Sequence, residues 1–102
     1  MTTSITAAEL KEKLASNKDI CLLDVRRRAD YDQSPATIAG ATWHDPEQVA
    51  EWGRTLPANK DLIVYCVRGG SVSQSVARTL QESHPNVRFL EGGIIGWQDA
   101  GK

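Results

Sequence analysis

Residues 62–80 constrain the fold of this chain more than any other stretch. They comprise an apolar run at 62–65 (LIVY), a cysteine followed by a short loop at 66–70 (CVRGG), and a helical pattern at 71–80. A short, apolar, β-branched run of this kind is typical of a strand buried on both faces of a parallel sheet. Cys66 is therefore predicted to stand at the carboxyl end of a strand, directly before a glycine turn and a helix.

The loop after this strand predicts a site for an anion. Gly69 and Gly70 allow positive φ angles, so successive backbone N–H groups can converge on one point. Ser71 and Gln74 have the spacing of a capping box, which predicts that the helix begins at Ser71 and directs its positive end to the same point. A cysteine thiol in such a place is expected to ionise readily and to act as a nucleophile.

Strand and helix patterns alternate along the rest of the chain. Helices are predicted over residues 7–15, 46–52, 71–80 and 94–100. Strands are predicted over 20–25, 38–43, 62–65 and 87–90, while 29–36 has the composition of an irregular turn. This alternation predicts an α/β domain with a mainly parallel sheet that binds its ligand at the carboxyl ends of the strands.

Two helix starts carry additional local signals. Thr6 and Glu9 form a capping box before the first helix. Asp45 is a favourable N-cap residue for the second, and Pro46 after it suits the first helical position.

Composition limits the classes of function. The 102 residues suit one domain over 1–102. The net charge of −1 gives no electrostatic reason to bind nucleic acid or an anionic membrane. The chain start is not a signal peptide and no run could span a bilayer, which indicates a cytoplasmic protein. The two cysteines form no CxxC pair or Cys/His cluster, so we expect free thiols, no metal site and no cofactor.

Three motifs occur in a fixed order. The first is LDVR at 23–26, followed by Tyr31 and IAGA at 38–41; the second is YCVRGGS at 65–71; the third is EGG at 91–93, followed by GW at 96–97. In this order and spacing they resemble the rhodanese domain, a family of single-domain sulfurtransferases, over essentially the whole chain. The resemblance implies a three-layer α/β domain, with helices on both faces of a mainly parallel sheet of about five strands.

The resemblance also implies that sulfane sulfur is transferred through a persulfide on Cys66. The thiolate would take sulfur from thiosulfate or a similar donor and pass it to cyanide or a thiol, including a thiol of an acceptor protein. Backbone N–H groups of the loop would hold the anionic sulfur. The residues expected to bind the donor are Val67, Arg68, Gly69, Gly70 and Ser71.

Structural interpretations compete at several of these positions. Arg68 is either a donor contact or a solvated charge. Ser71 is interpreted mainly as a helix cap. We expect Asp24 and Arg26 to form a structural ion pair, and Cys21 to be a small buried residue. The arginines at 26–28 form either a solvated turn or a positive rim to the site.

Two other functions stay open. A cysteine phosphatase or arsenate reductase would use a similar loop, but it usually needs arginine six positions after the cysteine, where this chain has Val72. A rhodanese-like module that only binds a partner protein often lacks the cysteine, and here Cys66 is present. The loop ends in Ser71 rather than the arginine of many family members, so the sequence leaves the substrate open.

Overall fold

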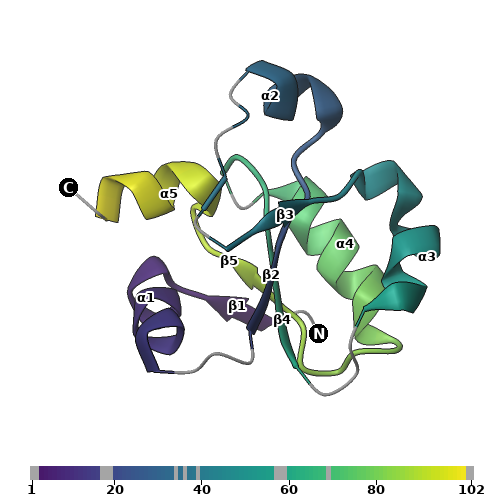
Figure 1. Ribbon diagram of the computed structural model, residues 1–102, viewed down its shortest axis with the longest axis horizontal. Coiled ribbons are helices and arrows are strands. Elements are labelled where there is room, and N and C mark those ends of the chain that lie inside the picture. Colours follow the sequence, from purple (N-terminus) through teal and green to yellow (C-terminus); the bar gives the residue numbers. More distant parts are fainter. Residues whose placement is uncertain are drawn as a thin grey trace.

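The computed structural model describes residues 3–16, 20–33, 35, 37–38, 40–56, 60–68 and 70–100. These residues include a five-stranded sheet with the strand order β1-β5-β4-β2-β3, and every neighbouring pair is parallel (Figure 1). The strands are β1 (Thr3–Ile5), β2 (Ile20–Asp24), β3 (Thr42–Trp43), β4 (Asp61–Tyr65) and β5 (Arg88–Leu90). The prediction of an α/β fold with a parallel sheet is confirmed.

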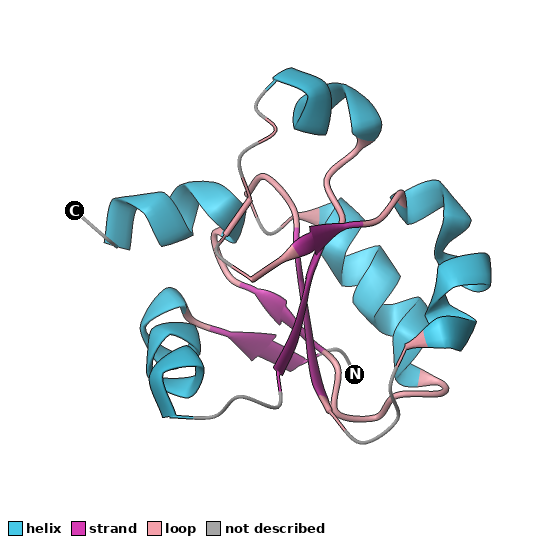
Figure 2. Cartoon of the chain, in the orientation of Figure 1, coloured by secondary structure: helices cyan, strands magenta, loops and turns pink. Residues whose placement is uncertain are grey.

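Helices cover both faces of this sheet, as Figures 1 and 2 show. They are α1 (Ala7–Ser16), α2 (Arg28–Gln33), α3 (Val49–Trp52), α4 (Ser71–Gln81) and α5 (Gly93–Ala100), with the 3-10 turns η1 (Pro46–Gln48) and η2 (Gly53–Thr55) on either side of α3. α1 and α5 pack on one face, while α3 and α4 pack on the other. No helix among the described residues is long and apolar enough to cross a membrane.

The central strand β4 contributes to both cores. Ile63 and Tyr65 belong to the core beneath α1 and α5, whereas Leu62 and Val64 belong to the core beneath α3 and α4. Side chains of a strand alternate between its two faces, so burial of both faces requires an apolar residue at every position. This explains why the run at 62–65 contains no charged residue.

The structure differs from the predicted helices and strands at several places. The helix predicted over 46–52 consists of the 3-10 turn η1 followed by the four-residue helix α3. β1 is not predicted, because three residues pairing at a sheet edge have no distinctive pattern. The helix α2 covers the first part of the segment 29–36, which is predicted as an irregular turn; it has no buried residue and hence no apolar stripe. The strand predicted over 38–43 is reduced to β3, because Gly40 has a φ of 88° and turns the chain.

The helix caps follow the sequence at two starts and differ at a third. Thr6 N donates to Glu9 Oε1 at 3.1 Å and Glu9 N donates to Thr6 Oγ1 at 3.1 Å, which confirms the capping box. These bonds hold the pKa of Glu9 below its ordinary value. Asp45 accepts from Glu47 N at 2.9 Å, as expected of an N-cap. In α4, however, the N-cap is Gly70 and no side chain caps the helix, so the capping box predicted at Ser71 is wrong.

Candidate active site

The first turn of α5 supports the loop that carries Cys66. Ile94 N donates to the carbonyl of Cys66 at 2.9 Å, and Ile95 N donates to the carbonyl of Val67 at 3.2 Å. Gly93 precedes them with a φ of 58°. A Cβ atom at Gly93 would lie 2.3 Å from the carbonyl oxygen of Cys66, so only glycine fits there. The EGG motif at 91–93 therefore begins the helix turn whose N–H groups support the cysteine loop at 66–70.

Cys66 contacts a serine that is absent from the predicted site. Cys66 follows β4 directly and is 5% exposed, and its S–H donates to Ser73 Oγ at 3.2 Å. Ser73 is fully buried, and its own hydroxyl donates to the carbonyl of Gly70 at 3.5 Å. When Cys66 is ionised, the Ser73 hydroxyl can rotate and donate to the sulfur instead, which would stabilise the thiolate.

A sequence signal for Ser73 does exist. Ser73 shares a helical stripe with Val76, Ala77 and Leu80, all of which are buried in α4. Val72, the apolar residue before Ser73, is only half-buried. Ser73 can be identified as a polar residue on the apolar stripe of a helix. It lies in the first turn of that helix, directly after the cysteine loop, where a buried hydroxyl can reach the sulfur.

Cys66 lies in an open cavity of about 460 Å³. Four of the five residues predicted to bind the donor line it with the cysteine: Val67, Arg68, Gly70 and Ser71. The fifth, Gly69, lies outside the described residues. The other lining residues are Arg26, Arg27, Asp30 and Val72, so the wall carries more positive than negative charge. The structure therefore brings the predicted loop residues together around the sulfur.

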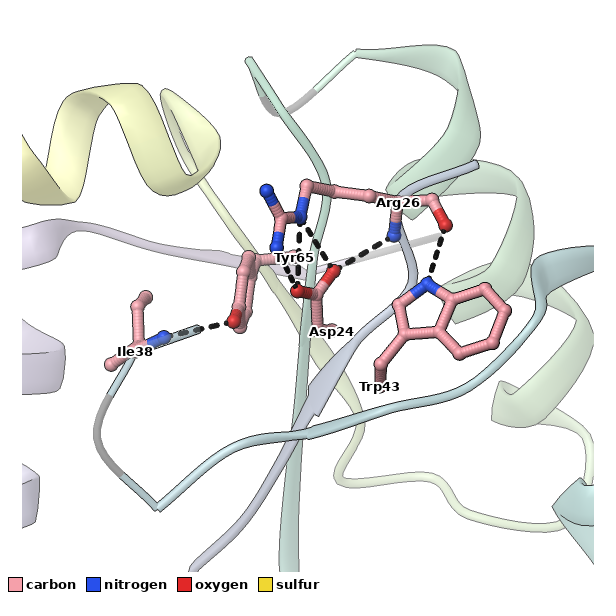
Figure 3. A network of polar contacts seen from close by, with 5 residues as sticks. All are labelled: Asp24, Arg26, Ile38, Trp43 and Tyr65. Atoms are coloured by element: carbon pink, nitrogen blue, oxygen red, sulfur yellow. Dashed lines mark hydrogen bonds and ion pairs between the residues drawn. The ribbon is translucent and has the colours of Figure 1, made fainter. Parts of the chain in front are cut away.

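Arg26, which lines this cavity, forms a buried ion pair with Asp24 (Figure 3). Arg26 Nη2 donates to Asp24 Oδ2 at 2.7 Å and Arg26 Nε to the same oxygen at 2.9 Å, with the two residues 2% and 0% exposed. Burial by itself would lower the pKa of Arg26, but the hydrogen bonds and charge of Asp24 raise it above its ordinary value. The predicted structural ion pair is confirmed.

Aromatic residues hold this ion pair in place. Trp43 Nε1 donates to the carbonyl of Arg26 at 2.9 Å, and Tyr31 stacks on Trp43 with ring centroids 4.9 Å apart. The Arg26 guanidinium lies 5.4 Å from the centroid of the Tyr31 ring. The hydroxyl of Tyr65 accepts from Ile38 N at 3.1 Å, and burial raises its pKa, so it stays protonated. The loop after β2 is therefore rigidly attached to the sheet.

The other candidate side chains lie away from the cavity. Cys21 is a free thiol, half-buried rather than fully buried, at the edge of the core beneath α3 and α4. Burial raises the pKa of Cys21, which disfavours its thiolate. His44 packs against the Trp52 ring at 4.8 Å, and burial lowers its pKa. Within the described part of the chain, no three His, Cys, Asp or Glu side chains gather in a way that could hold a metal ion.

Comparison with known proteins places this site in a family. The sequence model of the family described as "Rhodanese-like domain" matches residues 6–100. The chain is 29% identical to a sulfurtransferase of Allochromatium vinosum over 95% of its own length and 89% of that protein. It is 32% identical to the thiosulfate sulfurtransferase GlpE of Coxiella burnetii, covering 84% of this chain and 78% of that protein.

The fold agrees with a solved structure of the same kind. A crystal structure of a rhodanese-related protein from Thermoplasma volcanium superposes with a TM-score of 0.82 and 28% sequence identity, covering 97% of this chain and 93% of that one. The family match covers all three motifs. They form the strand end with the buried ion pair, the cysteine loop, and the glycine turn that supports this loop. The chain belongs to the rhodanese-like domain family, among relatives that are sulfurtransferases.

Proposed function

We propose that this protein is a thiosulfate sulfurtransferase that carries sulfane sulfur as a persulfide on Cys66. The observation that supports this most directly is the position of Cys66, which contacts the buried Ser73 hydroxyl and opens into a cavity with arginines in its wall. A dianionic donor is attracted to such a wall. The name of the GlpE relative points to the same donor.

In the first half of the reaction, the Cys66 thiolate attacks the outer sulfur of thiosulfate. A bond forms between Sγ and that sulfur, the sulfur–sulfur bond of thiosulfate breaks, and sulfite leaves with the electron pair. The products are the Cys66 persulfide anion and a sulfite dianion, so charge is conserved. Sulfite is stable as an anion, and no side chain has to protonate it.

In the second half, an acceptor attacks the outer sulfur of the persulfide. With cyanide, a carbon–sulfur bond forms and the bond to Sγ breaks. Thiocyanate dissociates, and the Cys66 thiolate is regenerated. Ser73 acts in this step, because its hydroxyl can donate to the sulfur that becomes negative. The N–H groups of the loop and the amino end of α4 are suited to hold the outer sulfur while it carries charge.

Arg27 and Arg68 are the residues we assign to attraction of the donor. Both are exposed, both line the Cys66 cavity, and neither has an ion-pair partner among the described residues. Arg26 lines the same cavity, but its guanidinium is bound to Asp24.

The test is the mass of the intact protein after incubation with thiosulfate. The wild type is expected to gain the mass of one sulfur atom and to lose it on addition of cyanide, with one thiocyanate formed. Cys66→Ser should gain nothing, whereas the matched control Cys21→Ser should behave like the wild type. An unmodified Cys66 would favour the binding module, and efficient hydrolysis of an aryl phosphate without sulfite release would favour the phosphatase.

A further inference from the structure

The cavity around Cys66 adjoins a second, larger one. The second cavity has a volume of about 650 Å³ and is lined by residues at the start of α2, around the turn η1 and in the first half of α4. Figure 1 shows where α2 and α4 lie. Arg27, Ser71 and Val72 line both cavities. The two spaces therefore share one wall, and a molecule in the second cavity can extend towards the sulfur in the first.

Charges of both signs line this second cavity. Arg27 and Arg28 stand on the α2 side, while Asp45 and Glu47 stand on the η1 side. Arg28 forms an exposed ion pair with Asp32 at 3.8 Å, and Asp45 already accepts a hydrogen bond from Glu47 N. The side chains of Arg27 and Glu47 make no ion pair with another described residue. One cation and one anion that have no ion-pair partner among the described residues thus line this cavity.

The proposed reaction needs a place for the body of the acceptor. In the second half-reaction the acceptor must direct a nucleophilic atom at the outer sulfur of the persulfide, which occupies the Cys66 cavity. Cyanide needs no further space, but the rest of a thiol molecule must occupy a neighbouring space. The second cavity is in the range of volumes that bind small molecules.

We propose that the second cavity binds the acceptor and is selective for a small zwitterionic thiol, an amino-acid or short-peptide thiol that has both an ammonium and a carboxylate group. This rests on the proposed function. The carboxylate pairs with Arg27, the ammonium pairs with Glu47, and the thiol extends into the Cys66 cavity. An acceptor with anionic groups alone is disfavoured here, because Asp45 and Glu47 repel it.

Atoms and charge balance in the transfer step. The acceptor thiol first gives its proton to the outer sulfur of the persulfide anion that the first half-reaction leaves on Cys66. The resulting acceptor thiolate attacks that sulfur and forms a new sulfur–sulfur bond. The bond between that sulfur and Sγ breaks, and its electron pair leaves Cys66 as a thiolate. The product is the persulfide of the acceptor, which retains the proton.

The experiment is a single-turnover transfer from preloaded persulfide. Protein loaded with thiosulfate and freed of excess donor is mixed with the dipeptide cysteinylglycine or with its N-acetyl derivative, which lacks the ammonium group. For each variant the second-order rate constant of the dipeptide is divided by that of the acetylated dipeptide. Glu47→Gln is expected to lower this ratio about threefold to tenfold, since one charge pair is lost.

Matched variants make the outcome specific. Glu82→Gln removes an exposed carboxylate after the other end of α4 and is expected to leave the ratio unchanged. Arg27→Gln is expected to slow both dipeptides, because both have the carboxylate. An unchanged ratio in Glu47→Gln, with thiocyanate still formed from cyanide, would overturn the acceptor site alone. A protein that does not load with sulfur at all would contradict the proposed function, and the acceptor site with it.

Discussion

Two neighbouring strand ends in this molecule use arginine in opposite ways. β2 and β4 pair in parallel, with Asp24 opposite Tyr65, so their carboxyl ends lie side by side. After β2, Arg26 is 2% exposed and bound to Asp24; after β4, Arg68 is exposed beside Cys66 and has no ion-pair partner among the described residues. The first arginine makes the wall rigid, and the second is available to a ligand. Burial and pairing, rather than residue type, separate the structural arginine from the candidate functional one.

The Asp24–Arg26 pair also shows why a buried ion pair can be necessary without being a large source of stability. Transferring two charges from water to the protein interior has a desolvation cost close to what their attraction returns. Removal of one partner leaves the other charge buried, which is strongly unfavourable. The contrast between the two strand ends can therefore be tested by substitution.

The largest effect is expected from Asp24→Asn, which keeps the shape of the side chain but removes the buried carboxylate charge that Arg26 binds. We expect the free energy of unfolding in urea to fall by about 3–5 kcal/mol. The control is Asp32→Asn, which breaks the exposed pair with Arg28 and should change stability by less than about 1 kcal/mol. Equal effects of the two substitutions would show that the buried ion pair matters no more to stability than the exposed one.

Gly93→Ala is expected to have the next largest effect. A Cβ there would approach the carbonyl oxygens of Cys66 and Val67 to 2.3 and 2.5 Å, in addition to the cost of a positive φ. The loss should be about 2–4 kcal/mol in urea unfolding, together with reduced loading of Cys66. Gly40→Ala is the matched control, because Gly40 has a φ of 88° but a Cβ added there would meet nothing within 4 Å. It should cost only about 1–2 kcal/mol. If Gly40→Ala lowers the free energy of unfolding as much as Gly93→Ala does, the close approach of Gly93 to the Cys66 loop does not contribute to stability.

Ser73→Ala tests the hydrogen bond between Ser73 and Cys66, which follows β4. Without the hydroxyl the Cys66 sulfur loses its hydrogen-bond partner, so alkylation of Cys66 by iodoacetamide should slow about tenfold. The urea-unfolded forms of the variant and the wild type should react at equal rates. Ser75→Ala, at an exposed position of the same helix, should leave the rate of the folded protein unchanged. An unchanged rate in Ser73→Ala would remove Ser73 from the site.

The smallest effect is expected from Arg68→Ala. The apparent KM for thiosulfate should rise about twofold to fivefold, and more at low salt than at high salt, because an exposed charge is screened. Stability should change by less than about 0.5 kcal/mol. Arg78→Ala removes another exposed arginine, in the last turn of α4, and should not change KM. A KM unaffected by Arg68→Ala would make Arg68 a solvated charge.

Predictions from the sequence were confirmed where a few neighbouring residues are enough to determine the local structure. The apolar run at 62–65 can only be a buried strand, and Thr6 with Glu9 satisfies the first N–H groups of α1 through their own side chains. α2 could not be predicted in this way, because it has no buried residue and so no apolar stripe in the sequence. Tyr31 of α2 stacks on Trp43, which lies in β3, and such a contact is not visible in the local sequence.

The same division applies to the candidate site. The position of Cys66 after a buried strand and before a helix could be predicted from the sequence alone, because hydrophobic periodicity acts within a few residues. The positive φ expected at Gly70 is wrong, because its φ is −87°. Three further features depend on the folded chain: Ser73 contacts the sulfur, Gly93 supports the loop from the end of the chain, and a second cavity adjoins the first. These are contacts between segments, and packing of the whole sheet and its helices determines them.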